Sequence, residues 1–356
     1  MLAERETFFV SRGFVESLEM IIAILGPKSG FVQFGIDVLL STLEAIKGNA
    51  QFHTMIDLDI DALDAIARQS ESAVVNCTLP SSELCRQLEM RGIPFVIFLD
   101  NGAALYRKLR TIDGLERYDA IRAASLYLAA LHDEALENPA AIFKREKLSE
   151  LGPERFSINL IDRLILSGDA TVNALVKTMV ARKAASNAII DRDDSQLIAE
   201  EDDSLIVNVL DPFYSVKETA PLRKVTWPPS LFFCGENDPF KGPCSLIGPA
   251  RIVIHGPYLH LPPGGWVATI DVEVADNLSG NIIISEIASS AVLHNEELSQ
   301  KELARGEFGL PISGRFTFEQ AFEVASPLES LQISFSTKEG AIEGSFGLRN
   351  VTVSRA

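Results

Sequence analysis

The chain has 356 residues, of which 47% are hydrophobic and 23% are charged, and its formal net charge at pH 7 is −17. This length allows two domains, because single hydrophobic cores rarely grow past about 250–300 residues. The acidic balance disfavours nucleic acid and anionic membrane surfaces as main partners, since both select clusters of Lys and Arg. A nucleotide remains compatible with this charge, because it needs only one local positive site.

The sequence contains no segment that indicates a membrane span or a secretory signal. No apolar run approaches the ~18 residues of a membrane helix, and the N-terminus lacks the order of basic, apolar and small residues. Four cysteines, Cys77, Cys85, Cys234 and Cys244, form no CxxC pair and no pattern with the five histidines. We therefore expect free thiols, no metal site and a cytoplasmic protein.

A short loop near the N-terminus is the first feature with chemical meaning. The apolar run Met20–Leu25 predicts a strand, and the apolar periodicity of Phe31–Ile46 predicts a helix. The turn Gly26-Pro27-Lys28-Ser29-Gly30 joins them. Unpaired N–H groups at such a helix start lie at the positive end of the helix dipole, and Lys28 adds a full charge. The loop therefore predicts an anion site, most often for phosphate, although a purely structural turn would have the same composition.

Strands and helices continue to alternate up to about residue 210. Further strands are predicted at Ser72–Cys77 and Pro94–Leu99. Further helices are predicted at Ser81–Arg91, Ala103–Leu109, Ala120–Leu136 and Ile158–Arg182. This alternation indicates an α/β domain over residues 1–210, with a parallel sheet covered by helices as in P-loop-like proteins.

The second half of the chain has a different texture. Residues 211–230 are rich in proline and predict a linker or a strap. From residue 231 to 356, runs of strand length are separated by Gly, Pro, Asn, Ser and Asp, which predicts an all-β sandwich or jelly roll. The predicted strands are Ala250–His255, Trp266–Val274, Ile282–Ile287, Arg315–Val324, Leu331–Ser336 and Gly347–Ser354. One short helix is predicted at Glu296–Ala304.

The loop after Leu25 resembles the phosphosulfate-binding loop of sulfotransferases, in which a strand ends in a Pro-Lys-Ser-Gly-Thr-Thr turn. The resemblance implies 3′-phosphoadenosine 5′-phosphosulfate as cofactor, with Lys28 and the loop amides stabilising charge on the bridging oxygen. His53 is the histidine placed to act as general base, and a surface or half-buried histidine is the alternative. The implied cofactor-binding residues are Gly26, Pro27, Lys28, Ser29, Gly30, Phe31 and Arg107.

This sequence departs from the sulfotransferase pattern in two places. Phe31-Val32 replaces the Thr-Thr pair, and Leu99 stands where the family has an Arg that contacts the 3′-phosphate. Arg107 falls near the position of the family's Ser. These departures imply either a divergent enzyme or a non-catalytic protein with a degenerate nucleotide-binding domain.

A kinase-like interpretation of the same loop requires a carboxylate that holds Mg²⁺ at the end of a neighbouring strand. Asp100 follows the strand that ends at Leu99 and has this position. The sequence Asp100-Asn101-Gly102 is also typical of a simple turn. A P-loop kinase-like phosphotransferase therefore stays as a further alternative.

Two segments of the second domain resemble the early and closing strands of carbohydrate-binding jelly rolls. They are Ile254–Val267, with its Gly-Pro-Tyr and Leu-Pro-Pro-Gly sequences, and Gly347–Val353. Aromatic faces stack on sugar rings and polar side chains bind hydroxyls, whereas a core position would bury the same aromatic residues. The residues implied to bind a glycan are Tyr258, His260, Trp266, Arg349 and Asn350.

Together the two resemblances predict a sulfotransferase-like protein that modifies or recognises a glycan or polysaccharide, with a place in bacterial surface polysaccharide production. A non-catalytic protein that binds glycan or another protein is the alternative. Retention of Gly26-Pro27-Lys28-Ser29-Gly30 favours the enzyme, and loss of the Thr-Thr pair and the Arg favours the binding protein.

Overall fold

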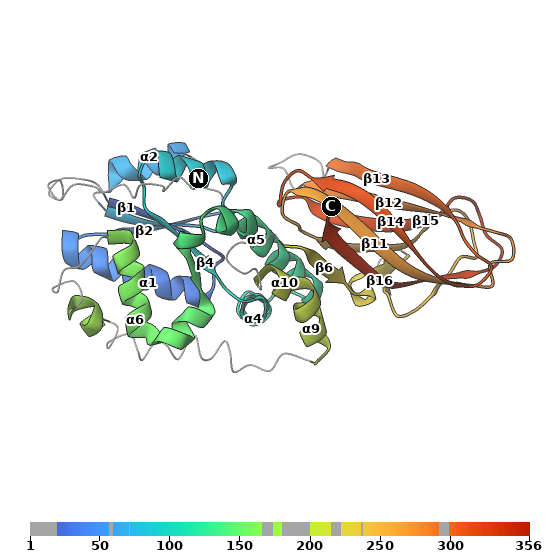
Figure 1. Cartoon of the computed structure of the whole chain (residues 1–356), viewed down its shortest axis with the longest axis horizontal. Helices are drawn as coiled ribbons and strands as arrows, with labels where there is room; N and C mark the ends of the chain where they lie inside the picture. Colours follow the sequence, from blue (N-terminus) through green and yellow to red (C-terminus); the bar gives the residue numbers. More distant parts are fainter. Residues whose placement is uncertain are drawn as a thin grey trace, which may run out of the picture.

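A computed structural model describes residues 20–56, 60–70, 72–165, 174–179, 200–214, 222–235, 238–291 and 299–356. Figure 1 shows an α/β unit and a β-sandwich lying side by side along the longest axis of the molecule, with the predicted order in the chain. Among the helices within these ranges, none combines the length and the apolar character needed to span a bilayer.

The α/β unit is built on five parallel strands in the order β2-β3-β1-β4-β5. The bounds are Met20–Leu25 for β1, Gln51–Met55 for β2, Ser72–Cys77 for β3, Phe95–Leu99 for β4 and Ile142–Lys144 for β5. β1 and β3 are apolar on both faces and almost completely buried, as expected for central strands of a parallel sheet covered on both sides. The predictions of β1, β3 and β4 are confirmed.

Helices cover both faces of this sheet. Helices α1 and α6 pack on one face, and α2, α3 and α5 pack on the other. Their bounds are Gly30–Lys47 for α1, Ile60–Gln69 for α2, Ser82–Met90 for α3, Gly102–Thr111 for α4, Arg117–Glu137 for α5 and Arg145–Ile165 for α6. The three-layer α/β class predicted from the sequence is confirmed.

Two predictions in this unit need correction. Strand β2 is absent from the prediction, because this edge strand is largely exposed and lacks an apolar run. The helix predicted at Ile158–Arg182 is not continuous, since α6 ends at Ile165 and residues 174–179 form a separate helical segment. The remaining residues of that prediction lie outside the described ranges.

The sandwich consists of two antiparallel sheets. One has the order β13-β12-β15-β10-β7-β8, and the other has the order β14-β11-β16-β6, with β9 also pairing with β16. The first sheet contains β7 (Phe233–Cys234), β8 (Asp238–Pro239), β10 (Ile252–Leu259), β12 (Ile282–Ala291), β13 (Ser299–Gly309) and β15 (Ser330–Thr337). The second contains β6 (Lys224–Trp227), β9 (Cys244–Ser245), β11 (Gly264–Ala275), β14 (Gly314–Val324) and β16 (Ser345–Arg355). The predicted all-β sandwich is confirmed.

Three details of this half differ from the sequence predictions. The helix predicted at Glu296–Ala304 is wrong for its described part, because residues from Ser299 onward form β13 and pair with β12. The segment predicted as a linker, 211–230, contains β6, which adds a strand beside β16. It also contains α10 (Asp211–Tyr214), which continues α9 (Glu200–Leu205) through the π-helical turn Ile206–Leu210.

The prediction of free thiols is wrong for two of the four cysteines. Cys234 and Cys244 form a disulfide between β7 and β9, which belong to different sheets of the sandwich. Cys77 and Cys85 are buried thiols in the α/β unit. No local pattern predicts this pairing, because the folding of the two sheets, not a CxxC spacing, brings the two side chains together.

Candidate functional site

The loop between β1 and α1 is held tightly against the sheet. Gly26 donates its N–H to the Cys77 carbonyl at 3.0 Å. A Cβ at Gly26 would lie 3.0 Å from the Phe98 carbonyl oxygen, which is tighter than most Cβ contacts, so the loop packs closely on β4 at this glycine. Ser29 is the N-cap of α1, and its hydroxyl accepts a hydrogen bond from the Val32 N–H at 3.3 Å.

Two backbone donors remain at the start of α1. The N–H groups of Gly30 and Phe31 have no acceptor among the described residues, whereas those of Val32 and Gln33 bond to Ser29. The Phe31 side chain is completely buried, so this residue contributes only its backbone to the loop. An 18-residue helix therefore presents open donors at its positive end.

A hollow of about 400 Å³ lies over this helix start. Its lining residues are Lys28, Ser29, Gly30, Val32, Gln33, Ile36, Phe52, Thr54, Asn76 and Lys108. No Asp or Glu of the described chain is among them, although the whole chain carries a net charge of −17. The lining of the hollow thus contains two lysines and no carboxylate, in a protein that is acidic overall.

Lys28 and Lys108 reach the hollow from two diverging connections of the sheet. The chain leaves β1 through α1 toward β2 on one side, and it leaves β4 through α4 and α5 toward β5 on the other. Ligands of open α/β sheets bind at the carboxyl ends of strands where successive connections diverge in this way. Lys28 is exposed, and Lys108 also pairs with Asp113 at 2.5 Å.

Asn76 adds a polar group with an unsatisfied atom. It lies near the carboxyl end of β3, lines the hollow and is only 1% exposed. Its Oδ1 atom is buried without a hydrogen-bond partner among the described residues. A buried acceptor in this state destabilises a fold by about 1–3 kcal/mol. A ligand that carries a hydrogen-bond donor would satisfy it.

The structure brings together only part of the predicted cofactor site. Lys28, Ser29 and Gly30 line the hollow, and Gly26 and Pro27 shape the loop before them. Arg107 does not line it, whereas its neighbour Lys108 does. The sequence did not point to Asn76 and Lys108, or to Phe52 and Thr54 of the unpredicted strand β2.

His53 lies outside the hollow. It occupies the centre of β2 between Phe52 and Thr54, which both line the hollow. Successive side chains of a strand point to opposite faces, so His53 points away from the site that its neighbours line. The structure therefore does not bring the predicted general base to the loop.

Asp100 is held in a buried ion pair. Its carboxylate is fully buried and accepts a hydrogen bond from Arg145 Nη1 at 3.0 Å and from the Asn101 N–H at 3.0 Å. A buried carboxylate that a guanidinium neutralises is not available to bind a metal ion. Within the described residues there is also no cluster of three or more His, Cys, Asp or Glu side chains suited to a metal.

Tyr258 and His260 lie at the junction of the two units. The Arg122 guanidinium of α5 lies 4.8 Å from the Tyr258 ring centroid, and its Nε donates to the Pro257 carbonyl at 3.1 Å. The Tyr258 hydroxyl bonds to His255 Nδ1 at 2.8 Å, and burial raises the pKa of the Tyr258 phenol. One continuous apolar cluster runs from α4 and α5 through residues 205–213 into the sandwich.

His260 is buried at the same junction. Its backbone N–H donates to the Ser125 hydroxyl of α5 at 3.3 Å, and its Nδ1 lies 2.9 Å from the Pro327 carbonyl oxygen. Burial lowers the pKa of the His260 imidazole to about 4. The ring is therefore neutral at pH 7 and packs as part of the junction.

The remaining predicted glycan ligands are divided between the core and the outer face of the sandwich. Trp266 is completely buried, its Nε1 donates to the Pro262 carbonyl at 3.0 Å, and the Arg355 guanidinium lies 4.8 Å from its ring centroid. In this structure the Trp266 ring offers no face to a sugar. Arg349 and Asn350 lie on β16, where Arg349 pairs with Glu273 at 2.8 Å.

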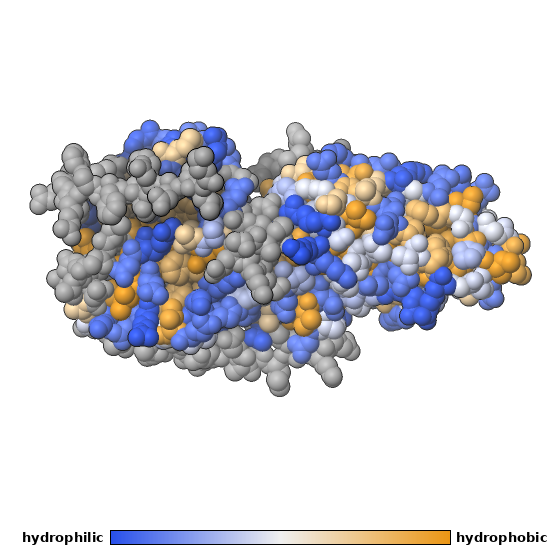
Figure 2. All heavy atoms as spheres, viewed as in Figure 1, coloured by the Kyte–Doolittle hydropathy of each residue, from blue (hydrophilic) through white to orange (hydrophobic). Residues whose placement is uncertain are grey.

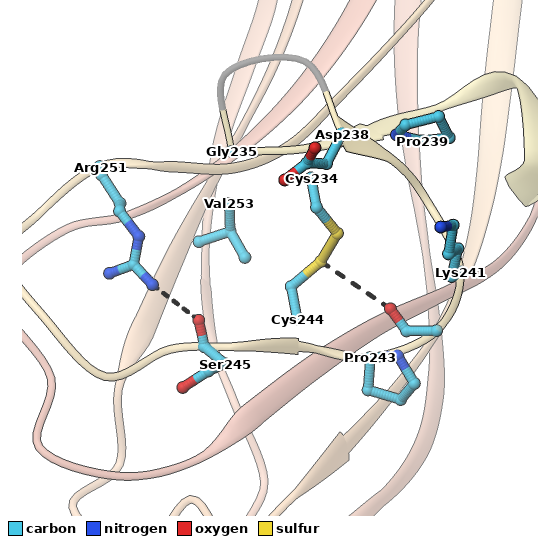
Figure 3. Close-up of a pocket in the computed structure, with 11 residues that line it drawn as sticks. Cys234, Gly235, Asp238, Pro239, Lys241, Pro243, Cys244, Ser245, Arg251 and Val253 are labelled. Atoms are coloured by element: carbon cyan, nitrogen blue, oxygen red, sulfur yellow. Dashed lines mark hydrogen bonds between the residues drawn. A yellow bond between two sulfur atoms is a disulfide. The ribbon is translucent and has the colours of Figure 1, made fainter.

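A second hollow, of about 570 Å³, surrounds the Cys234–Cys244 disulfide (Figure 3). Its polar lining contains both signs of charge, from Asp238, Lys241 and Arg251. The Arg251 guanidinium donates to the Ser245 carbonyl at 2.8 Å and lies 3.4 Å from two further carbonyl oxygens of the same loop. These bonds hold the loop in place and occupy the Arg251 guanidinium. The lining described for this hollow therefore has no set of converging donors comparable to that over α1.

The solved structures described below are similar to part of this chain and include carbohydrate-binding modules. No protein-family model matches the chain, and no curated protein matches it. A family 16 carbohydrate-binding module is 11% identical over 34% of this chain and 79% of its own, with a TM-score of 0.23. The CBM22-2 xylan-binding domain of Paenibacillus barcinonensis Xyn10C is 11% identical over 37% of this chain and 88% of its own, with a TM-score of 0.23.

TmCBM61, solved in complex with β-1,4-galactotriose, is 10% identical over 38% of this chain and 83% of its own, with a TM-score of 0.22. At these scores, the similarity says nothing about what this chain binds. Evidence for function therefore has to come from the geometry of the chain itself.

Proposed function

We propose that the hollow over the start of α1 binds a small molecule that carries a phosphate or sulfate group. The observation that carries this proposal is the convergence of Lys28, Lys108 and the open N–H group of Gly30 on a site without a carboxylate in its described lining. Each charged hydrogen bond to such an oxyanion contributes about 1.5–3 kcal/mol. Helix dipole and lysine charge act in the same direction.

The surroundings of the donors constrain the rest of the ligand. Asn76 is part of the lining, and its side-chain amide can bond to a hydroxyl or N–H group of the ligand. Phe52 is 40% exposed and, with Ile36, supplies an apolar wall. A phosphate or sulfate ester with a polar, partly apolar body fits this lining better than a bare inorganic ion.

The sulfotransferase resemblance gives the proposal its most specific form, with 3′-phosphoadenosine 5′-phosphosulfate as the ligand. The loop residues fit the sulfate-bearing end of this molecule. They do not complete a transfer site, because no His, Asp or Glu of the described residues lines the hollow to accept a proton from an acceptor hydroxyl. The proposal is therefore binding, and it includes no sulfuryl or phosphoryl transfer step.

Calorimetric titration tests this proposal with three proteins and two ligands. The proteins are the full chain, its Lys28→Ala variant and a control variant, Lys224→Ala, which removes an exposed lysine from β6. The ligands are 3′-phosphoadenosine 5′-phosphate and adenosine. We expect Lys28→Ala to weaken nucleotide binding about 10- to 100-fold and Lys224→Ala to leave it unchanged.

Adenosine, which lacks the oxyanions, should bind far more weakly than the nucleotide. Absence of heat at millimolar nucleotide would contradict the proposal. Equal affinity of wild type and Lys28→Ala would also contradict it, because the anion would then lie elsewhere.

A second candidate function, glycan binding, rests on the outer face of the sheet β14-β11-β16-β6. Short polar side chains lie there in cross-strand rows: Thr352, Thr269 and Glu319 form one row, and Asn350, Asp271 and Thr317 form the next. Rows of hydroxyl, amide and carboxylate groups suit the hydroxyls of a sugar chain. Asn350, which was predicted to bind a glycan, lies on this face. Trp266 was predicted to bind the same glycan, but it is buried and cannot contribute to this face.

A glycan array probed with the full chain and with Asn350→Ala tests this second candidate. Selective binding to a glycan class that the variant loses would support it. Binding that Asn350→Ala leaves intact, or no binding to any glycan, would remove this face from consideration.

A further inference from the structure

The end of the sandwich farthest from the α/β unit carries a group of exposed apolar side chains. Four loops meet there, 246–251, 276–281, 310–313 and 338–344, and we call them the distal tip. Each loop presents one large apolar residue: Ile247, Leu278, Ile312 and Ile342, which are 58%, 71%, 61% and 82% exposed. Figure 2 shows apolar atoms at this right-hand end of the molecule.

Asn277 fixes two of these loops to each other. It is completely buried, and its Nδ2 lies 3.1 Å from the Leu310 carbonyl oxygen and 3.2 Å from that of Pro311. Its Oδ1 accepts hydrogen bonds from the backbone and side-chain nitrogens of Asn281. Its own N–H donates to the Ile312 carbonyl at 2.8 Å.

The other two loops are joined by backbone hydrogen bonds. Gly248 and Ala341 exchange N–H to carbonyl bonds of 2.8 Å each, and the Leu246 N–H donates to the Gly344 carbonyl at 2.9 Å. The Ser279 hydroxyl also bonds to the Glu343 carboxylate at 2.6 Å and connects the two pairs of loops. The apolar side chains therefore project from loops that these hydrogen bonds connect to one another.

The charges around these side chains are mainly negative. Asp276 and Glu339 are exposed, and neither has an ion-pair partner among the described residues. Lys338 is paired with Glu307 at 2.6 Å, and Arg251 bonds to carbonyls of its own loop. The four loops together carry Asp276, Glu339 and Glu343 against Lys338 and Arg251, so the rim around this apolar centre has a small excess of negative charge.

We propose that the distal tip docks a protein partner whose contact surface has an apolar centre ringed by Lys and Arg. Contiguous exposed apolar side chains with a polar rim are the usual anatomy of a protein interaction site. A second copy of this chain would bring acidic rim against acidic rim, and an anionic bilayer would repel the same carboxylates. A partner with an apolar centre and a basic rim would cover the exposed apolar side chains and would also pair with the carboxylates around them.

This inference is independent of the proposed oxyanion site. The hollow over α1 lies in the α/β unit, and the distal tip lies beyond the opposite end of the sandwich (Figure 1). Each proposal can fail without affecting the other.

The test selects partners from random peptides displayed on phage, with the immobilised full chain as bait. The same selection runs on Ile342→Asp and on the control Met90→Asp, which places the same charge at a residue of α3 that is 60% exposed. Both positions are on the surface, so equal melting temperatures verify folding. We expect enriched peptides that combine large apolar residues with Lys and Arg, and whose affinity falls about tenfold or more in Ile342→Asp but not in Met90→Asp.

Binding of these peptides should also weaken as salt rises. The proposal is overturned if no peptide depends on Ile342, or if the enriched peptides are acidic or neutral. It is also overturned if phosphatidylcholine vesicles, with or without phosphatidylserine, bind wild type but not Ile342→Asp. A concentration-dependent dimer in sedimentation that Ile342→Asp abolishes would identify a second copy as the occupant and would equally overturn it.

Discussion

The two units of this chain place their chemistry in opposite ways. In the α/β unit, polar groups gather where strands end and a helix begins, so Lys28, Ser29 and Asn76 meet at one edge of the sheet. In the sandwich, the most distinctive residues, Trp266 and His260, are buried in the core and at the junction. The exposed groups of the sandwich lie instead on its outer strand faces and at its loops.

This difference follows from how each architecture satisfies its backbone. A parallel sheet leaves helix N-termini and strand ends open at one edge, and these groups form a site without any special side chain. A sandwich pairs its backbone between strands and requires large side chains to fill the space between its sheets. Aromatic residues in its sequence are therefore weaker evidence of binding than a Gly-rich loop between a strand and a helix.

Trp266→Ala is expected to have the largest effect. It tests most directly whether the distinctive aromatic residues of the sandwich belong to its core. Removing a completely buried indole should lower the free energy of unfolding by about 3–5 kcal/mol, measured by denaturant titration. Thr269→Ala, three residues along β11 on the outer face, should change it by less than about 0.5 kcal/mol. Equal stability of wild type and Trp266→Ala would mean that the indole is not part of the core.

Arg145→Met tests whether the edge of the α/β sheet contains a closed ion pair beside the open hollow. The variant leaves the fully buried Asp100 carboxylate without its guanidinium, and we expect a loss of about 3 kcal/mol in the free energy of unfolding. The exposed pair of Arg86 and Glu83 supplies the control, since Arg86→Met should cost less than about 0.5 kcal/mol. Similar losses in both variants would show that Asp100 is solvated and open to other ligands.

The pH dependence of stability gives a smaller effect at the junction. Burial lowers the pKa of the His260 imidazole to about 4 in the folded chain, from its ordinary value of 6.5. The unfolded chain therefore binds a proton first as pH falls, and the stability that neutral His260 provides above pH 6.5 is lost between pH 6.5 and 4. Between pH 7 and 5, wild type should lose about 2 kcal/mol more than His260→Gln, which cannot titrate there. Parallel pH profiles of the two proteins would place His260 in solvent.

Much of the fold could be predicted from the sequence, because its signals are local. The apolar runs of β1, β3 and β4 and the Ser81 cap of α3 mark their elements directly. The edge strand β2 escaped prediction because its pairing with β3, not its own composition, makes it a strand. β13 was predicted as a helix for the same reason, since its pairing with β12 makes it a strand and this pairing is not visible in its own composition.

Only part of the candidate site could be predicted from the sequence. The loop from Gly26 to Gly30 contains its own signal, but Asn76 and Lys108 become neighbours of Lys28 only through the strand order of the sheet. The disulfide between Cys234 and Cys244 likewise depends on two sheets meeting. Residue types alone also did not separate a sugar-binding tryptophan from a core tryptophan, since burial is a property of the assembled sandwich.

The most direct test of the oxyanion site is a titration of the ¹⁵N-labelled, deuterated chain with 3′-phosphoadenosine 5′-phosphate, followed by transverse relaxation-optimised NMR. We expect the amide signals of Gly30 and Phe31 to move most as the anion accepts hydrogen bonds from these two groups, and Lys28→Ala to reduce the shifts at equal ligand concentration. Unchanged Gly30 and Phe31 signals, with shifts confined to other parts of the chain, would contradict the account.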